Sequence, residues 1–285
     1  MASAKDIRRR IKTVKNIQQI TQAMKLVASA RLMKAQQRVQ AARPFAEKIQ
    51  QIITGLAASG TELNHPLMEV REEQSIAVLI IGADRGLAGS YHANVVRMTQ
   101  KFYREHELMD LRVFVMGKKA AGSIRKLPVP LEGTKDLPGN DVDFAMIRPL
   151  SLMLQKMYTE GEVDAVHVIY TQFRSAISQK TVVQRLLPVE APQGEEQETG
   201  GEFIFEPGPD ELLSSLISRY VDTQLFRAVL ESIASEQGAR MTSMSSATTN
   251  AGEMIDRLTL SLNRARQSAI TKEISEIVGT AEALK

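Results

Sequence analysis

The sequence has 285 residues, 43% hydrophobic and 24% charged, a composition that suits a folded chain of one or two domains and excludes a disordered one. It contains no cysteine, which excludes disulfides, thiolate metal sites and a catalytic thiol. No segment approaches the roughly 18 consecutive apolar residues of a membrane span, and the N-terminus lacks the apolar centre of a secretory signal. We therefore expect a soluble protein that remains inside the cell.

Basic residues are concentrated at the N-terminus. Residues 1–43 contain eleven Lys or Arg and one acid, Asp6, a net charge of +10, whereas the whole chain carries only +3. This segment could be a nucleic-acid arm, a membrane-surface helix, a docking face for an acidic protein, or a solvated face. It has no aromatic residue to stack on bases, which disfavours single-strand binding but leaves phosphate contact open.

Two proline-free windows, residues 1–43 and 210–285, predict long helices at the ends of the chain. The first helix continues past Pro44 to about Leu56. Each window carries an apolar stripe spaced by about 3.5 residues, which is typical of a left-handed coiled coil. We expect the helices to pair antiparallel, with the second projecting beyond the first by about 28 Å. The expected seam positions are Ile7, Ile11, Val14, Ile17, Ile20, Met24, Ala28, Leu32, Ala35, Val39 and Ala42 in the first helix, and Met241, Met244, Thr248, Ala251, Ile255, Leu258, Leu262, Ala265 and Ala269 in the second.

Between these windows, apolar runs alternate with amphipathic segments, a pattern that predicts an α/β domain with a mostly parallel sheet. The expected strands are 75–83, 111–117 and 163–173, with 180–189 as an antiparallel fourth strand, and the expected helices are 90–107, 118–127 and 143–158. The last helix should begin near Arg148, so that Pro149 lies in its first turn. We therefore predict a Rossmann-like α/β domain at 75–190, an acidic loop and foot segment at 191–209, and coiled-coil helices at 1–57 and 210–285.

Two glycine-containing motifs resemble phosphate-binding loops incompletely. DRGLAG, residues 84–89, follows the first strand, where open α/β sheets often bind ligands, but it lacks the G-x-G-x-x-G spacing. A tight surface turn, a protein contact and a phosphate site remain open for it. MGKKAAGS, residues 116–123, fails the P-loop pattern because Arg112 and Lys119 stand where Gly and Ser or Thr are required.

No constellation of catalytic or metal-binding residues emerges from the sequence. The four histidines, His65, His92, His106 and His167, are dispersed and form no HExxH pattern. We expect no metal, no cofactor and no catalytic residue in this chain. The run of small residues from Gly238 to Gly252 is a weak helix former, so we expect a slender helix stabilised by its surroundings.

Three separated motifs together resemble one family. They are DIRRRIKTVKNIQQITQAMKLVASARL near the start, DRGLAG after the first strand, and SEQGARMTSMSSATTNAGEMIDRLTLSLNRARQSAITKEISEIVGTAEAL at the end. In this order they are similar to the gamma subunits of the F-type ATP synthases over nearly the whole chain. The resemblance implies a non-catalytic rotor shaft whose helices lie inside a ring of alternating alpha and beta subunits. It also implies contacts with the epsilon subunit and the c-subunit ring, and ATP synthesis or hydrolysis coupled to ion flow.

The resemblance implies two sets of contact residues. Expected contacts with the beta subunits, including their acidic lever loops, are Met24, Lys25, Asp84, Arg85, Gly86, Leu87, Ala88, Arg266, Gln267 and Thr271. Expected contacts with the c-subunit ring are Phe203, Ile204, Phe205 and Glu206. Gln22 and Lys25 stand where the family usually has Lys and Glu, and Gly238 replaces a usual alanine.

The same resemblance implies a location, and one competing function remains open beside it. Because the cysteine-bearing insert of the chloroplast type is absent, we expect a bacterial member at the cytoplasmic face of the cell membrane, without direct membrane insertion. The alternative is a basic coiled-coil protein that binds nucleic acid, which would show steep salt dependence. The rotor interpretation predicts no nucleic-acid partner.

Overall fold

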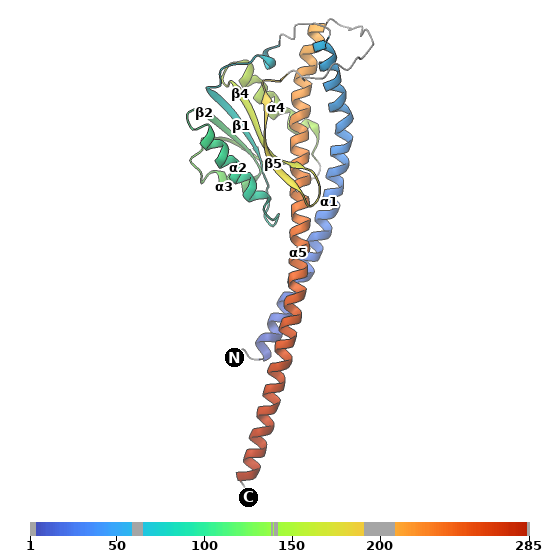
Figure 1. Ribbon diagram of the computed structural model, residues 1–285, viewed down its shortest axis with the longest axis vertical. Helices are drawn as coiled ribbons and strands as arrows, with labels where there is room; N and C mark the ends of the chain where they lie inside the picture. Colours follow the sequence, from blue (N-terminus) through green and yellow to red (C-terminus); the bar gives the residue numbers. More distant parts are fainter. Residues whose placement is uncertain (1–3, 59–64, 138, 140–141, 191–208, 284–285) are drawn as a thin grey trace. The chain divides into compact units, whose positions relative to one another are not determined.

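Figure 1 shows the computed structural model, which describes residues 4–58, 65–137, 139, 142–190 and 209–283. The chain divides into two compact units. The first consists of Met1–Ala28 and Met241–Lys285, and the second of Ser29–Arg240. Two long helices, α1 (Ala4–Ala58) and α5 (Pro209–Ala283), contribute to both units, as the proline-free windows predict. Among the described helices, none has the length and hydropathy that a bilayer span requires.

The second unit contains a five-stranded sheet in the order β3-β2-β1-β4-β5. β1 pairs in parallel with β2 and β4, β2 pairs in parallel with β3, and β5 runs antiparallel to β4. The strands are β1 (Ser75–Ile81), β2 (Asp110–Met116), β3 (Leu131–Lys135), β4 (Ala165–Phe173) and β5 (Gln179–Leu187), and the helices between them are α2 (Tyr91–Glu105), α3 (Lys118–Ile124) and α4 (Phe144–Thr159). The predicted α/β class is confirmed, and so is the predicted antiparallel strand at 180–189, which corresponds to β5.

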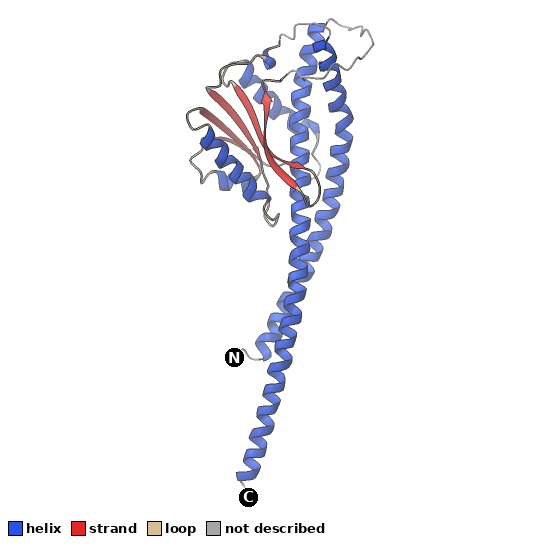
Figure 2. Cartoon of the chain, viewed as in Figure 1, coloured by secondary structure: helices blue, strands red, loops and turns tan. Residues whose placement is uncertain are grey.

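Both faces of this sheet are covered (Figure 2). Alternate residues of β1, including Ile76, Val78 and Ile80, join a core cluster that also contains Val95 and Phe102 of α2. The intervening residues of β1 are buried as well. Burial on both faces explains why SIAVLII is a continuous apolar run rather than an alternating one.

The sequence prediction missed β3 and placed the start of α4 too late. β3 reads LEGTK, lies at the sheet edge and is mostly exposed, so it carries no apolar alternation to find. α4 begins at Phe144, which puts Pro149 in the second turn rather than the first. A proline there removes only the bond to the carbonyl of Ala145. Since Ala145 and Pro149 are both exposed, that carbonyl faces solvent and the helix tolerates the proline.

In the first unit, α1 and α5 pair antiparallel, as predicted. The Oγ1 atom of Thr248 donates a hydrogen bond to Oγ1 of Thr21 at 2.8 Å. One turn further along α5, a Cβ on Gly252 would lie 3.2 Å from Nε2 of Gln18. The partner number on α1 falls as the number on α5 rises, which defines the antiparallel direction.

The predicted seam of α5 is confirmed from Met241 to Ala265. Among the seam positions of α1 whose side chains the structure describes, which leave out Ala42, two are wrong. Ile17 and Ile20 are 47% and 58% exposed, and Gln18 and Thr21 occupy the seam instead. A period of 3.5 requires steps of three and four to alternate. The predicted steps from Val14 to Ile17 to Ile20 were both three, so they followed apolar residues off the seam.

The C-terminal part of α5 extends beyond the start of α1. The register of Thr21 with Thr248 places Ala4 opposite about residue 265, which leaves about 27 Å of α5 without this partner. Every residue from 266 to 280 is exposed. The predicted projection is therefore confirmed, but Ala269, expected in the seam, lies outside it because no described residue of α1 reaches that far.

Candidate functional site

The predicted turn Asp84–Ala88 follows β1 at the carboxyl edge of the sheet (Figure 1). β1 lies between β2 and β4, and the chain order reverses there, since β2 and β3 lie on one side and β4 and β5 on the other. In open α/β sheets such a switch point is where ligands bind. The motif and its position relative to β1 are therefore as predicted.

Asp84 fixes the shape of this turn. Its Oδ1 atom accepts hydrogen bonds from the backbone N–H groups of Lys118 at 2.8 Å and Leu137 at 3.3 Å. These bonds connect the turn to the start of α3 and to the segment after β3. Asp84 therefore stabilises the structure of the turn through Oδ1.

Leu87 is the apolar residue that the turn presents to solvent. Its φ is +63°, in the left-handed region, and its side chain is 62% exposed, whereas the next residue, Ala88, is only 4% exposed. A left-handed conformation costs a non-glycine residue roughly 1–2 kcal/mol. Residues held in such a conformation cluster at functional sites, which makes Leu87 a candidate contact residue.

Helix α5 occupies the switch point through two serines. The last paired residues of β1 and β4 are Ile80 and Ile169, so Thr171 of β4 has no partner on β1. Instead, the N–H of Thr171 donates to Oγ of Ser232 at 3.1 Å, and Oγ of Ser235 donates to the carbonyl of Thr171 at 2.9 Å. The two side chains, three residues apart, replace the missing strand.

The following turn of α5 packs closely against the loops on either side of the switch point. A Cβ on Gly238 would lie 3.3 Å from the carbonyl oxygen of Ala176, in the loop between β4 and β5. On the other side, Nη2 of Arg240 donates to the carbonyl of Gly86 at 3.3 Å. All residues from 231 to 240 are buried. The slender helix stabilised by its surroundings was expected over Gly238–Gly252. Gly238–Arg240 are buried in this way, whereas most residues from 241 to 252 are half-buried or exposed.

A buried ion pair, which the sequence prediction missed, lies beneath the turn. Nη2 of Arg240 also contacts Oε1 of Glu236 at 2.5 Å, and the two side chains are 9% and 7% exposed. Burial raises the pKa of Glu236, and the charge of Arg240 opposes this effect. The four-residue spacing in SEQGAR was the available signal, because it places both side chains on one helix face.

The remaining predicted contact residues of the described chain lie in the first unit. Met24 and Lys25 are half-buried on α1, and Arg266, Gln267 and Thr271 are exposed on α5. The pairing register puts Met24 opposite about residue 245, so the two groups are separated by roughly 30 Å along α5. The two groups therefore lie well apart along the helix pair. The predicted c-ring contacts Phe203, Ile204, Phe205 and Glu206 lie outside the described residues.

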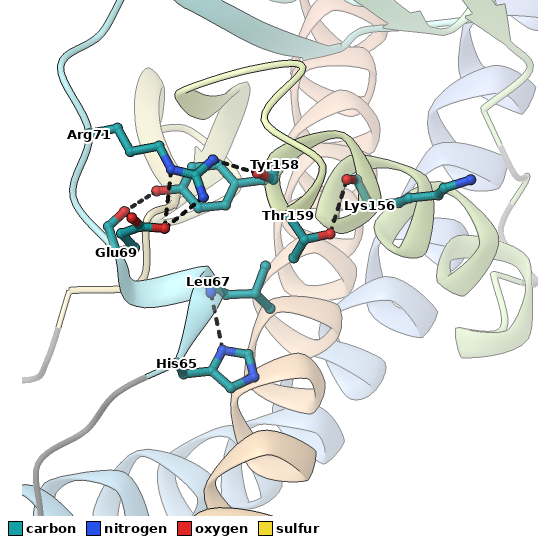
Figure 3. A network of polar contacts seen from close by, with 7 residues as sticks. All are labelled: His65, Leu67, Glu69, Arg71, Lys156, Tyr158 and Thr159. Atoms are coloured by element: carbon teal, nitrogen blue, oxygen red, sulfur yellow. Dashed lines mark hydrogen bonds and ion pairs between the residues drawn. The ribbon is translucent and has the colours of Figure 1, made fainter.

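A second polar network anchors the chain segment that precedes β1 (Figure 3). Arg71 donates to the carbonyl of Tyr158 at 2.8 Å and to Oε2 of Glu69 at 2.7 Å, and its guanidinium lies 4.9 Å from the centre of the Tyr158 ring. The hydroxyl of Tyr158 donates to the carbonyl of Glu69. The backbone N–H of Leu67 donates to Nδ1 of His65 at 3.1 Å. This network fixes the segment against the end of α4 and has a structural role.

Over the described ranges, no three His, Asp or Glu side chains come together as a metal site would require. His92 bonds Ser123, and His167 packs near Phe102 and His106. These histidines belong to the packing of the α/β domain.

Comparison with known proteins identifies relatives that are similar in sequence over the whole chain. The family model for ATP synthase matches residues 3–284. Curated relatives described as ATP synthase gamma chains include those of Heliobacterium modesticaldum, 44% identical, and Desulforamulus reducens and Desulfitobacterium hafniense, both 46% identical. In each case the similarity covers 100% of both chains.

Solved structures share the fold at lower sequence identity. A chain of the Euglena gracilis mitochondrial ATP synthase, from an OSCP/F1/c-ring structure, is 19% identical, with a TM-score of 0.67 over 99% of this chain and 94% of that one. A chain from the central stalk and c-ring of the Tetrahymena thermophila enzyme is 23% identical, with a TM-score of 0.60 over 80% of this chain and 99% of that one. These similarities support the fold described above.

Proposed function

Because the chain belongs to the family of ATP synthase gamma chains, we propose that its paired helices turn inside a ring of alternating alpha and beta subunits. The chain is the central rotor shaft of a bacterial F-type ATP synthase and a non-catalytic subunit of that enzyme. The observation that best supports this mechanism is the antiparallel pair of helices in the first unit. A rod of this kind, with exposed apolar residues at its tip, requires surrounding subunits.

The mechanism follows from the asymmetry of the shaft. Three identical catalytic sites can hold different nucleotide affinities only if something asymmetric contacts each of them differently. Rotation of the shaft then changes which beta conformation is favoured, which is a coupling free energy between rotor angle and nucleotide binding. The catalytic groups belong to the beta subunits, and this chain supplies the differential contacts.

We propose three separate contact sites with the beta subunits. The first is the Asp84–Ala88 turn, where Leu87 and Arg85 are the exposed side chains and Asp84 and Ala88 shape the turn. The second is formed by Met24 and Lys25. The third is formed by Arg266, Gln267 and Thr271, of which all three are exposed. The family resemblance and this exposure support the assignments.

Further proposals concern the rest of the assembly. The segment Phe203–Glu206 would contact the c-subunit ring, and the α/β domain at 75–190 would contact the epsilon subunit. We propose the division into coiled-coil helices at 1–57 and 210–285 and a foot segment at 191–209 as the functional division of the chain. The chain is part of the membrane-associated F1 complex, and the bacterial relatives support a position at the cytoplasmic face of the membrane.

Reconstitution tests this function. Purified alpha and beta subunits would be combined with and without the full-length chain, and ATP hydrolysis would be measured for each mixture and for the chain alone. We expect the chain alone to show no turnover and the three-component mixture to form a stable, active complex. Turnover by the pure chain, or failure to join the alpha and beta subunits, would refute the proposal.

A further inference from the structure

A pocket of about 250 Å3 lies beside the Asp84–Ala88 turn in the second unit. Its polar wall consists of Arg31 from α1, Asp84 and Arg85 from the turn, and Glu236, Gln237 and Arg240 from α5. Three separate segments of the chain thus converge on one small cavity at the switch point of the sheet, where doubly wound domains bind ligands.

The arginines of this pocket have unused donors. Among the residues that the structure describes, the side chains of Arg31 and Arg85 form no hydrogen bond or ion pair, although the charge of Arg31 acts on Glu236. Arg240 uses Nη2 for Glu236 and for the carbonyl of Gly86. Guanidinium groups bind oxyanions through paired N–H donors, and phosphate fits this geometry well.

Gln237, one of the residues that line the pocket, carries an unsatisfied acceptor. Gln237 is 5% exposed, and its Oε1 atom is buried with no hydrogen-bond partner among the described residues. A buried polar atom without a partner is unusual in a folded protein and calls for a ligand or water. Since two carboxyl groups, those of Asp84 and Glu236, also line the wall, the pocket favours an anion that carries its own donor proton.

We propose that this pocket binds inorganic phosphate, held by the guanidinium groups of Arg31 and Arg85, and that the Gln237 side chain turns toward the cavity so that its Oε1 accepts a hydrogen bond from the phosphate. Phosphate near neutral pH is a mixture of its monoanion and dianion, both of which retain at least one O–H, whereas sulfate has none. Nucleotides are disfavoured by size, because pockets for ligands of that size occupy roughly 300–1,000 Å3. Bound phosphate would connect α1, the turn and α5.

Equilibrium dialysis of the full-length chain against radiolabelled phosphate tests the proposal, with unlabelled sulfate and ADP as competitors. We expect one phosphate per chain, weak competition by sulfate, and at least tenfold weaker binding in the double variant Arg31→Gln, Arg85→Gln. Gln237→Leu should abolish the preference for phosphate over sulfate. Arg125→Gln is the matched control, since Arg125 is exposed at the end of α3 and outside the pocket.

Circular dichroism of each variant would verify folding. We expect no change in folding when Arg31 and Arg85 are replaced, because both side chains are exposed and make no bond to a described residue. Equal competition by sulfate, with unchanged binding in the double arginine variant, would reduce the effect to adventitious anion binding and overturn the proposal. Stronger binding of ADP than of phosphate would overturn the assignment to inorganic phosphate. The assay contains no alpha or beta subunit, so its outcome is independent of the rotor function.

Discussion

His167 shows how the core of the α/β domain controls a single ionisable side chain. It lies on β4, with its ring 5.3 Å from that of Phe102, and both ring nitrogens are buried without a partner among the described residues. Burial lowers the pKa of His167 to about 4, and the nearby His106 contributes a smaller effect. The neutral imidazole is therefore the form that the folded state accepts.

This pKa predicts a pH dependence of stability. In the unfolded chain His167 should titrate near 6.5, so protonation favours unfolding as the pH falls from 6.5 toward 4. We expect His167→Leu to remove this pH-dependent loss of stability. Near pH 4, the loss in the free energy of unfolding is of order 1–3 kcal/mol. Urea unfolding of the full-length chain at several pH values would measure it. An unchanged difference between pH 6.5 and 4.5 in the variant would contradict the assignment.

At the residue scale, the sequence revealed the turn but not what surrounds it. DRGLAG was recognisable because it follows an apolar strand, and Asp84, Leu87 and their neighbours indeed lie together. The ion pair of Glu236 with Arg240 could not be connected to this turn, because Gly86 and Arg240 are 154 residues apart in the chain. Only the fold brings such distant groups into contact.

At the scale of helices and strands, periodicity predicted well where an element has one buried face. The seam of α5 follows alternating steps of three and four, and small residues such as Ala251 keep their place in it. On α1, polar Thr21 is buried at a position where an apolar residue was expected, because its hydroxyl bonds Thr248. A prediction based only on apolar residues therefore put the seam of α1 in the wrong place. β3 was not predicted because a strand at the edge of a sheet needs little apolar surface.

The seam of α5 predicts a contrast between neighbouring leucines. Leu258 and Leu262 are half-buried in the first unit, whereas Leu260 is 61% exposed on the same helix. Changing both Leu258 and Leu262 to Glu should cost about 1 kcal/mol for each half-buried leucine, before the cost of placing a charge in the seam. Thermal unfolding of the chain should show the loss, and the variant should not assemble with alpha and beta subunits.

Leu260→Glu is the matched control for the helix pair. It introduces the same charge on the same helix but outside the seam, so it should leave the unfolding of the isolated chain nearly unchanged. If Leu260→Glu destabilised the isolated chain as much as the seam variant, the antiparallel seam would be wrong.

At the scale of the whole molecule, the two units combine a rod and an α/β domain, and each could be predicted from a different signal. Absence of proline with a 3.5-residue period predicted the rod, and alternation of apolar runs predicted the sheet. The role of α5 within the domain could not be predicted. Ser232 and Ser235 bond the backbone of Thr171 in place of a neighbouring strand, and no sequence motif marks serines that do this. The rotor function depends on the rod, the domain and their partners together.

A reversible crosslink between this chain and a beta subunit tests the rotor claim most directly. The chain contains no cysteine, so an engineered one is the only thiol it carries. Leu87 is the suitable position, because its side chain is exposed and Ala88 is buried. Leu87→Cys would be paired with a cysteine in the acidic lever loop of a beta subunit.

The control crosslink lies within the first unit. Thr21→Cys and Thr248→Cys replace two side chains whose hydroxyls are 2.8 Å apart, and a disulfide there connects two helices of the same rotor. We predict that oxidation of the Leu87→Cys pair stops ATP turnover and that reduction restores it, whereas the control disulfide leaves turnover largely intact. Full turnover with the Leu87→Cys crosslink quantitatively formed would show that this chain does not rotate against the beta subunits.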